Sequence, residues 1–376
     1  MKLAIAQSNL TLLGGGEKVV LKVAQHYGAK IYTAEYNPKT TFPEFRDLDV
    51  EVIGSKSAAG ILPYGRVAQG LNYGLSFYNF RMRDDYDVIN AHMAPSHWIR
   101  NRNERVVWYC HTPLRDVYDL YEFRLSLKKP LQRPIYMLGA HAVRLMDKGV
   151  VRKLDYIFAN SANTQSRVTK YYGRDSEVLN GGVDYERYRD GGDGRYFLYP
   201  SRISPNKRQE YAIRAFEAFK RRRKGYRLLI VGPVSKDRQF SSYYRDVIAP
   251  LAKRVGDVEI LGGVSDRRYV ELLSRATAVL YPPINEDYGL VPLEGMASGK
   301  PVIAANEGGP RETIVDGKTG FLVDGEAEMA GRMLYVADHD MSKMGRLGKA
   351  RVRERYSWKR FFRVFDARIR KVAKGK

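Results

Sequence analysis

The sequence predicts an α/β protein with two domains, and three observations support this prediction. Short apolar runs of strand length alternate with amphipathic helical segments, which is the βαβ rhythm of parallel sheets. The 376 residues suffice for two ordinary α/β domains and exceed what one compact core normally holds. Apolar residues make up 44% of the chain, a fraction typical of globular proteins.

The composition restricts where the protein can work. The single cysteine, Cys110, rules out an internal disulfide and fits a reducing compartment. No apolar run approaches the ~18 residues of a membrane span. The opening segment MKLAIAQSN is expected to be a strand, because it lacks the cleavage site and apolar core of a signal peptide. We therefore expect a cytoplasmic protein, peripheral to the membrane if it contacts one.

The net charge of +22 calls for an anionic partner or a solvated basic face. Thirteen Lys or Arg residues lie between Gly345 and Lys376, against Glu354 and Asp366. Aromatic residues follow helical spacing there, so one face should be buried and the basic face solvated. A solvated helix and a contact with an anionic membrane both remain open. The sequence carries no signature of a nucleic-acid-binding fold, so nucleic acid is not expected as a partner.

The first half of the chain contains a regular series of expected strands. They are Leu3–Gln7, Ala29–Tyr36, Val50–Gly54, Asp87–Asn90, Arg105–Cys110 and Asp155–Ser161. Gly14, Gly15 and Gly16 follow the first strand and enter an amphipathic helix. Glycines at a helix start let a ligand approach the backbone N–H groups closely, although the pattern is not GxGxxG. The segment Gly191–Gly194 reads as an interdomain linker.

Three histidines follow predicted strands. His92 and His97 have neither the spacing nor the accompanying carboxylates of a metal site, so structural and acceptor-side roles both stay open. His111 begins the segment HTPLR, which ends in Arg115, directly after a strand. Ligands of open parallel sheets bind outside the carboxyl ends of strands, and His111 falls there.

The segment Glu122–Leu154 is predicted to be helical, amphipathic and basic, with Pro130 and Pro134 breaking it near its start. Its cations are Lys128, Lys129, Arg133, Arg144, Lys148, Arg152 and Lys153. A half-buried core helix and a helix on anionic lipid both fit this pattern.

The second half opens with the strand RYFLYP, followed by a loop that holds Arg202 and Lys207. Two cations in a loop that leads into a helix suit a diphosphate, since Arg can form a fork and Lys acts as a point charge. Two solvated cations are the alternative. Gly232 ends the next strand.

Asp266 begins a later helix. It is expected either to cap that helix or to accept hydrogen bonds from the N–H groups of a guanine base. Val264 could meet the base through its backbone.

The most informative stretch is YPPINEDYGLVPLEGMASGKPVIAANEGGPRETIVDGKTGFLVD. Glu286 precedes a short helix and Glu294 lies on it, because Pro292 tolerates only the first turn and Gly299 ends the helix. The first-turn N–H groups of such a helix can bind an anion. A carboxylate on each side suits a nucleotide sugar, with its central diphosphate and terminal hydroxyls. A capping Glu and a solvated Glu are the alternative.

Within this stretch, NEDYGLVPLEGMASGKPVIA followed by EGGPRETIVDGKTGFLV resembles the donor-site signature of retaining family-4-type glycosyltransferases. CHTP followed by Arg resembles a motif of their mannosyltransferase branch. The resemblance implies the GT-B fold, in which two Rossmann-like, doubly wound domains face a central cleft. The implied domains are an acceptor-binding domain at 1–190, a nucleotide-sugar-binding domain at 191–355, and a basic helix at 356–376 that packs back towards the N-terminal domain.

The resemblance also implies roles for individual residues. Arg202 and Lys207 would hold the pyrophosphate. Glu286 would bind the hydroxyls of the sugar, and Glu294 the ribose. His111 would lie beside the reacting carbon of the sugar. Further donor-binding residues would be Gly15, Gly16, Gly232, Val264, Asp266, Asp287, Tyr288, Gly289, Leu290 and Val291.

Arg115 is expected on the acceptor side. Many members of that branch have Tyr then Trp after this Arg, where this chain has Asp116, Val117 and Tyr118. The departure is expected to alter how the acceptor fits.

The implied reaction is transfer of a hexose with retention of configuration, with mannose from GDP-mannose as the first choice. The acceptor would be a glycan or a lipid-linked glycan, and no metal or other cofactor is expected. UDP-glucose or another UDP-hexose is the alternative donor. A nucleotide-sugar epimerase and a non-enzymatic basic membrane-binding protein are alternatives from other classes. Sugar release that requires an acceptor would exclude the first, and binding of any nucleotide would argue against the second.

Overall fold

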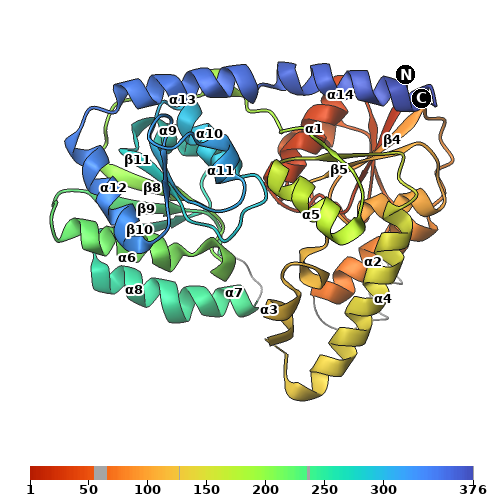
Figure 1. The fold of residues 1–376 in the computed structure, drawn as a ribbon, viewed down its shortest axis with the longest axis horizontal. Helices are drawn as coiled ribbons and strands as arrows, with labels where there is room; N and C mark the ends of the chain where they lie inside the picture. Colours follow the sequence, from red (N-terminus) through yellow and green to blue (C-terminus); the bar gives the residue numbers. More distant parts are fainter. Residues whose placement is uncertain (55–65, 127, 235–237, 376) are drawn as a thin grey trace. The chain divides into compact units, whose positions relative to one another are not determined.

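The computed structural model describes residues 1–54, 66–126, 128–234 and 238–375. The chain divides into two compact units (Figure 1). The N-terminal unit comprises Met1–Asn180 together with Phe362–Lys376, and the C-terminal unit comprises Gly181–Phe361. Each unit is built on a parallel sheet of its own.

The N-terminal unit contains a parallel sheet in the order β3-β2-β1-β4-β5-β6-β7. Its strands are β1 (Leu3–Gln7), β2 (Lys30–Thr33), β3 (Val50–Val52), β4 (Val88–Ala91), β5 (Val106–Cys110), β6 (Tyr156–Ala159) and β7 (Glu177–Val178). In register, Ile5 pairs with Ile31 on one side and with Asn90 on the other. All residues of β1, β4 and β5 are buried, as expected for central strands covered on both faces.

The helices of the N-terminal unit connect these strands. They are α1 (Gly15–Tyr27), α2 (Arg66–Asn79), α3 (Tyr121–Ser126), α4 (Arg133–Val151) and α5 (Ala162–Tyr172), with short 3₁₀ turns η1 (Pro43–Asp47), η3 (Ser96–Asn101), η4 (Arg115–Val117) and η5 (Pro130–Gln132). The expected break in the basic helical segment is present. Pro134 lies in the first turn of α4, where its missing N–H has no intrahelical acceptor to lose.

The C-terminal unit has a parallel sheet in the order β10-β9-β8-β11-β12-β13. Its strands are β8 (Tyr196–Pro200), β9 (Arg227–Val231), β10 (Val258–Gly262), β11 (Ala278–Tyr281), β12 (Val302–Ala305) and β13 (Phe321–Val323). Its helices are α6 (Gln209–Lys220), α7 (Arg238–Tyr243), α8 (Ala249–Val255), α9 (Asp266–Arg275), α10 (Leu290–Ala297), α11 (Pro310–Thr313), α12 (Glu326–Asp338) and α13 (Ser342–Arg355), with the short turns η6 (Tyr185–Arg187), η7 (Pro205–Lys207) and η8 (Tyr244–Ile248).

Helix α14 (Trp358–Ala373) starts in the C-terminal unit, and from Phe362 onward it belongs to the N-terminal unit. The ring of Phe362 stacks on His26 at 3.9 Å between centroids, and the Tyr27 hydroxyl donates to Asp366 at 2.6 Å. Phe365 is fully buried. The expected return of the C-terminal helix to the N-terminal domain is therefore confirmed (Figure 1).

The contacts place the boundary between the units ten residues earlier than the expected division at 190. Val183 N donates to Tyr356 O at 2.7 Å, and the Tyr288 hydroxyl donates to Gly181 O at 2.8 Å. These bonds attach the segment after Asn180 to the C-terminal unit.

The GGDG segment is not the linker between the units. Gly191 N donates to Ser274 O and Gly194 N to Arg275 O, both at 2.7 Å, so the segment is held against the end of α9 inside the C-terminal unit. Its glycine-rich composition suggested flexibility, but backbone hydrogen bonds fix it in place.

Both sheets have a point where the strand order reverses, between β1 and β4 and between β8 and β11. Ligands of doubly wound sheets bind outside the carboxyl ends of the strands at such points. The glycine loop follows β1, and His111 follows β5, the neighbour of β4. Arg202 follows β8 and Glu286 follows β11. Each unit thus carries predicted site residues at its own switch point.

Candidate active site

The Lys207–Glu286 pair is the centre of the predicted site in the C-terminal unit. Lys207 ends η7, and its Nζ lies 2.5 Å from Oε2 of Glu286, which follows β11. Both side chains are largely buried, at 14% and 19% exposed. Burial first, and then the charge of Glu286, raises the pKa of the Tyr281 hydroxyl, which hydrogen-bonds to that carboxylate. The structure therefore brings two of the predicted catalytic residues together, 79 positions apart in sequence.

Arg202 has a fixed backbone and an exposed side chain. Its carbonyl oxygen accepts from Gln209 Nε2 at 2.8 Å, which anchors the loop at the start of α6. Within the described ranges, its guanidinium makes no hydrogen bond or ion pair with the chain. The side chain is thus a solvated cation at the carboxyl end of β8, so its role in holding a diphosphate stays a prediction.

A glycine pair after β12 holds the segment that carries Glu286. A Cβ on Gly308 would lie 2.3 Å from the carbonyl oxygen of Glu286, and one on Gly309 would lie 2.2 Å from that of Tyr288. Gly309 N donates to Glu286 O at 2.8 Å. Only residues without a side chain permit this approach, so the EGGP segment sets the position of the Glu286 loop.

Glu307 and Arg208 support the same loop, and the sequence reasoning missed both. Glu307 Oε2 accepts from Asn285 N at 2.9 Å, and its Oε1 accepts from Arg208 Nη1 at 2.8 Å. Arg208 directly follows Lys207. The available signals were the Glu that opens the quoted EGGP segment and the Arg that follows Lys207, but spacing alone could not pair them.

Helix α10 begins at Leu290, slightly later than expected, immediately after Gly289. This residue has φ +82°, and a Cβ on it would lie 3.1 Å from the Tyr281 ring. Leu290 and Val291 form the first turn, whose N–H groups have no intrahelical acceptor. Pro292, which has no N–H, follows them. The positive end of α10 therefore lies just after Asp287 and Tyr288, three residues from Glu286.

Glu294 lies on α10 and is buried, with 8% of its surface exposed. Its Oε1 accepts from the Tyr188 hydroxyl at 3.0 Å and its Oε2 from the Tyr269 hydroxyl at 2.6 Å. Burial first, and then the Glu294 charge, raises the pKa of both tyrosines, so both hydroxyls donate. Neither tyrosine was predicted, because no local motif marks them.

Asp266 does not cap α9, so this part of the prediction is wrong. Ser265 has extended backbone angles, and its Oγ accepts from Arg268 N at 3.3 Å, which makes Ser265 the N-cap. Asp266 is the first helical residue, and its carboxylate, 71% exposed, pairs with Arg187. Its second expected role, as an acceptor for a base, stays a prediction.

Gly232 has a structural reason to be glycine. A Cβ there would lie 2.1 Å from Ser201 O, and Gly232 N donates to Gly262 O at 2.8 Å. The residue thus closes the ends of β8, β9 and β10 against one another. Val264, after β10, is half-buried against the core of the unit.

In the N-terminal unit, His111 pairs with His92. Nε2 of His111 lies 3.2 Å from Nδ1 of His92, and both side chains are buried. Burial lowers the pKa of His111 to about 3 and holds the pKa of His92 well below its usual value. Both rings are therefore uncharged near neutral pH, and either one can donate to the other according to its tautomer.

The glycine-entered helix lies beside this histidine pair. Gly15 is the first residue of α1, and Gly14 caps it. A Cβ on Gly16 would lie 2.8 Å from Met93 Sδ and 3.6 Å from His111 Cε1. The structure thus brings the predicted residues Gly16 and His111 together at the carboxyl ends of the strands of the N-terminal sheet.

His97 has a structural role. Its ring stacks on Trp108 at 4.1 Å, and its Nε2 lies 2.8 Å from Asp147 Oδ1. Asp147 is fully buried and also accepts from Trp98 Nε1 at 2.7 Å and from the Tyr172 hydroxyl at 2.7 Å. Burial raises the pKa of Asp147, but these hydrogen bonds outweigh burial and lower the pKa below its ordinary value. The network joins α4, α5 and η3.

Arg115, expected on the acceptor side, is held after β5 by Asp119. Its Nε donates to Asp119 Oδ2 at 2.9 Å, and Arg167 approaches the same oxygen at 3.5 Å. Since all three side chains are largely buried, Arg115 lies in a small charged cluster and not in open solvent.

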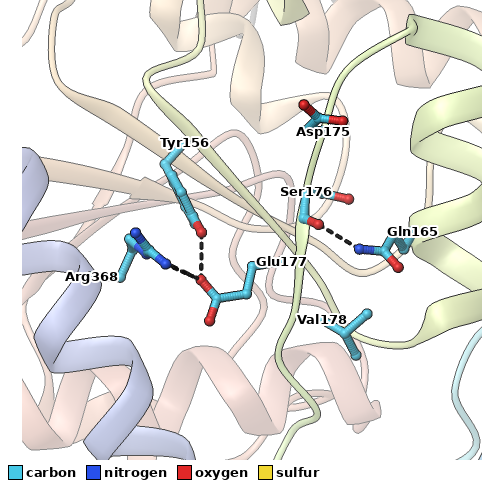
Figure 2. A pocket seen from close by; sticks show the side chains of 7 residues that line it. All are labelled: Tyr156, Gln165, Asp175, Ser176, Glu177, Val178 and Arg368. Carbon is cyan, nitrogen blue, oxygen red and sulfur yellow. Dashed lines mark hydrogen bonds and ion pairs between the residues drawn. The ribbon is translucent and has the colours of Figure 1, made fainter.

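One pocket of about 520 Å³ lies beside β6 and β7 of the N-terminal unit (Figure 2). Arg368 Nη2 donates to Glu177 Oε2 at 2.7 Å, and the Tyr156 hydroxyl donates to the same oxygen. Its lining contains none of the predicted site residues. Over the ranges that the structure describes, no cluster of three or more His, Cys, Asp or Glu side chains could hold a metal ion.

Comparisons with known proteins give family matches over most of the chain. Residues 13–187 match the family described as Glycosyltransferase Family 4, and residues 186–350 match Glycosyl transferases group 1. The alpha-1,3/1,6-mannosyltransferase ALG2 of Mus musculus is 30% identical over 92% of this chain and 90% of its own. The Neurospora crassa protein of that name is 32% identical, over 96% of this chain and 89% of its own.

Among solved structures, that of HepE from Anabaena in complex with UDP and glucose superposes with a TM-score of 0.77 at 18% identity. The superposition covers 99% of this chain and 100% of HepE. At this low identity the likeness is evidence for the fold alone. Together with the two doubly wound sheets, it confirms the GT-B architecture. The chain belongs to the family 4 glycosyltransferases, and the protein is a glycosyltransferase of the GT-B fold.

Proposed function

We propose that this glycosyltransferase moves mannose from GDP-mannose to a glycan or lipid-linked acceptor, with retention of anomeric configuration. The relatives named alpha-1,3/1,6-mannosyltransferase, which align with more than nine-tenths of the chain, support the choice of mannose. The HTP segment at His111 supports it independently.

The observation that carries the proposal is the Lys207–Glu286 ion pair, just ahead of the start of α10. A diphosphate bound by Lys207, Arg202 and the first-turn N–H groups of α10 would meet two cations and a helix start. Glu286 would then accept hydrogen bonds from sugar hydroxyls. Glu294, held by two tyrosines, would present a fixed carboxylate to the ribose.

The expected chemistry places the largest demand on the leaving group. The bond between the anomeric carbon and the donor phosphate oxygen breaks early, which leaves an oxocarbenium-like sugar and a diphosphate carrying the electron pair. Lys207 and Arg202 stabilise that developing negative charge. The acceptor hydroxyl attacks from the face that the diphosphate leaves, and a phosphate oxygen takes its proton. No step requires a metal ion.

His111 suits the sugar side because its imidazole is uncharged. A neutral ring can exchange a hydrogen bond with a sugar hydroxyl without placing a positive charge beside a carbon that itself becomes positive. An imidazolium there would oppose the transition state.

We propose that the enzyme acts from the cytoplasm on an acceptor at the membrane surface. None of the described helices is long and apolar enough to span a membrane.

The test is a panel of labelled nucleotide sugars, each offered with a lipid-linked and a soluble glycan acceptor, with and without EDTA. We expect transfer from GDP-mannose to a lipid-linked acceptor, unchanged by EDTA, and an NMR spectrum of the product with the anomeric configuration of the donor. If transfer occurred from UDP-hexoses alone, the donor would be a UDP-hexose and not GDP-mannose. Inversion, or loss of activity on chelation, would contradict the mechanism.

A further inference from the structure

Helix α4 carries two apolar faces, although only one of them packs on the protein. Tyr136, Ala140, Val143 and Val150 are buried at helical spacing and hold α4 to the N-terminal unit. A second set of apolar residues is exposed. Its members are Leu131 at 90%, Ile135 at 76%, Leu138 at 73% and Leu145 at 61%, where Leu131 belongs to η5 directly before α4.

The exposed residues form one continuous stripe. Leu131, Ile135, Leu138 and Leu145 are separated by four, three and seven positions, and Ala142 fills the gap at the same spacing. At 3.6 residues per turn these positions share one side of the helix, opposite the buried face. Soluble proteins rarely expose four large aliphatic side chains in a row, so the stripe marks an interaction surface.

The surroundings of the stripe are strongly basic. From Lys128 to Lys153 the chain has seven Lys or Arg residues and one acid, Asp147. Asp147 is fully buried in the hydrogen bonds of His97 and its neighbours, so it offsets no charge at the surface. Figure 1 shows the amino-terminal end of α4 projecting beyond the sheet of its own unit. Ile135 belongs to this end of the helix, and Leu131 belongs to η5 directly before it.

We propose that η5 and α4 form a membrane-docking surface, which lies flat in the headgroup region of an anionic lipid bilayer. The apolar stripe enters the acyl boundary while the flanking cations contact phosphate and carboxylate headgroups. Its 19 residues give α4 a length of about 28 Å along the membrane plane. A second copy of the chain is a poorer partner, because two such surfaces would set like charges against each other.

This surface gives the proposed function its location, since a lipid-linked acceptor would be presented where the helix docks. The inference rests on the proposed function only in that sense. Docking is therefore measured on the full-length protein without donor or acceptor, so its outcome is separate from that of the transfer assay.

The experiment is cosedimentation with two kinds of vesicle, of phosphatidylcholine alone and of phosphatidylcholine with phosphatidylserine. The native protein should sediment with the anionic vesicles, poorly with the neutral ones, and less with either as salt rises. Replacing the stripe by Leu131→Ser, Ile135→Ser and Leu138→Ser should lower the partition coefficient about 100-fold. Reversing Lys128→Glu and Lys129→Glu should lower it about tenfold or more.

Matched controls come from other exposed positions. Leu347→Ser removes an exposed leucine of α13, and Arg363→Glu with Lys371→Glu reverses two exposed cations of α14. Both should bind as the native protein does. Circular dichroism and thermal unfolding should report native folding for every variant, because the altered side chains are exposed except Lys128, which is half-buried with its ammonium over the Tyr136 ring.

Absence of the native protein from the anionic pellet would overturn the proposal, as would full binding by the serine triple variant. A native dimer that this triple variant converts to a monomer would identify a second copy as the occupant instead. In the transfer assay, the triple variant should keep native turnover on a water-soluble acceptor and lose it on an acceptor in anionic vesicles. Vesicle binding by a protein that transfers no sugar would refute the proposed function and leave the docking surface standing.

Discussion

The central side-chain pair of the predicted site is charged in the C-terminal unit and uncharged in the N-terminal unit. In the C-terminal unit the residues are charged, since Lys207 pairs with Glu286 at 2.5 Å and Glu294 accepts hydrogen bonds from two tyrosine hydroxyls. In the N-terminal unit the central pair is His111 and His92, two buried rings that burial keeps uncharged.

The proposed function would account for this difference by the two charges that sugar transfer separates. A leaving diphosphate gains negative charge and needs fixed cations and N–H groups, which the C-terminal unit offers. The anomeric carbon gains positive charge, and beside it a neutral imidazole is less unfavourable than a cation. The comparison therefore predicts that removing a charged side chain from the C-terminal site lowers turnover strongly. It also predicts that protonating the histidine pair of the N-terminal unit destabilises the fold.

The largest effect should follow from removing the paired cation. Lys207→Ala should lower kcat by roughly 10²–10³-fold, because the leaving diphosphate loses a fixed positive charge in a partly buried site. Turnover at saturating donor is the measurement. The control is Arg214→Ala on α6, which removes an exposed cation paired with Glu326 and should leave kcat unchanged. Near-native turnover by the Lys207 variant would remove the residue from the diphosphate site.

The tyrosines around Glu294 should matter for stability as well as for binding. Tyr188→Phe or Tyr269→Phe leaves a buried carboxylate oxygen with one donor fewer, so each should lower the free energy of unfolding by about 1–3 kcal/mol. Urea unfolding measures this. Tyr335→Phe, on an exposed ring of α12, is the matched control. If both tyrosine variants matched that control, Glu294 would not depend on these donors.

The neutral histidine pair predicts a pH dependence of stability. Between pH 6.5 and about 3 the unfolded chain binds a proton at His111 that the folded protein does not, so stability falls as pH falls through this window. For His111 alone the loss from pH 7 to pH 5 should be about 2 kcal/mol. In His111→Asn this pH-dependent loss should shrink by that amount, whereas in His339→Asn, a surface change, it should not. An unchanged slope in the His111 variant would show that the folded protein tolerates the charged ring.

The smallest expected effects are the losses of unfolding free energy in Ser265→Ala and Asp266→Ala, which differ from each other. Ser265→Ala removes the N-cap of α9 and should cost about 1 kcal/mol in the free energy of unfolding. Asp266→Ala should cost less, because its ion pair with Arg187 is mostly solvated on the carboxylate side. If Asp266 also accepts from guanine, its variant should bind GDP more weakly and UDP equally well. Equal losses for both nucleotides would exclude that role.

The parts of the site that the sequence predicted are those held by local spacing. Pro292 and Gly289 fix the start of α10 within a few residues, so the positions of Glu286 and Glu294 could be inferred without tertiary knowledge. Strand positions were also predictable, since each is a short apolar run. Their ends were less so: the expected strand at Ala29–Tyr36 is ordered as a ladder only over Lys30–Thr33.

The residues that sequence reasoning missed are those brought in by the fold. Tyr188 lies 106 positions from Glu294, and Arg208 lies 99 positions from Glu307, so no spacing rule connects them. The GGDG segment was misassigned for a related reason. Its composition indicates flexibility, but its hydrogen bonds to Ser274 and Arg275 depend on where α9 ends.

The most direct test of the central claim, that the C-terminal unit binds a nucleoside diphosphate at Lys207 and the start of α10, is equilibrium dialysis with labelled GDP. The native protein should bind GDP at one site, and Lys207→Ala should raise the Kd about tenfold or more while remaining folded. The same Kd for native and variant protein, or no binding of GDP by the native protein, would contradict the account.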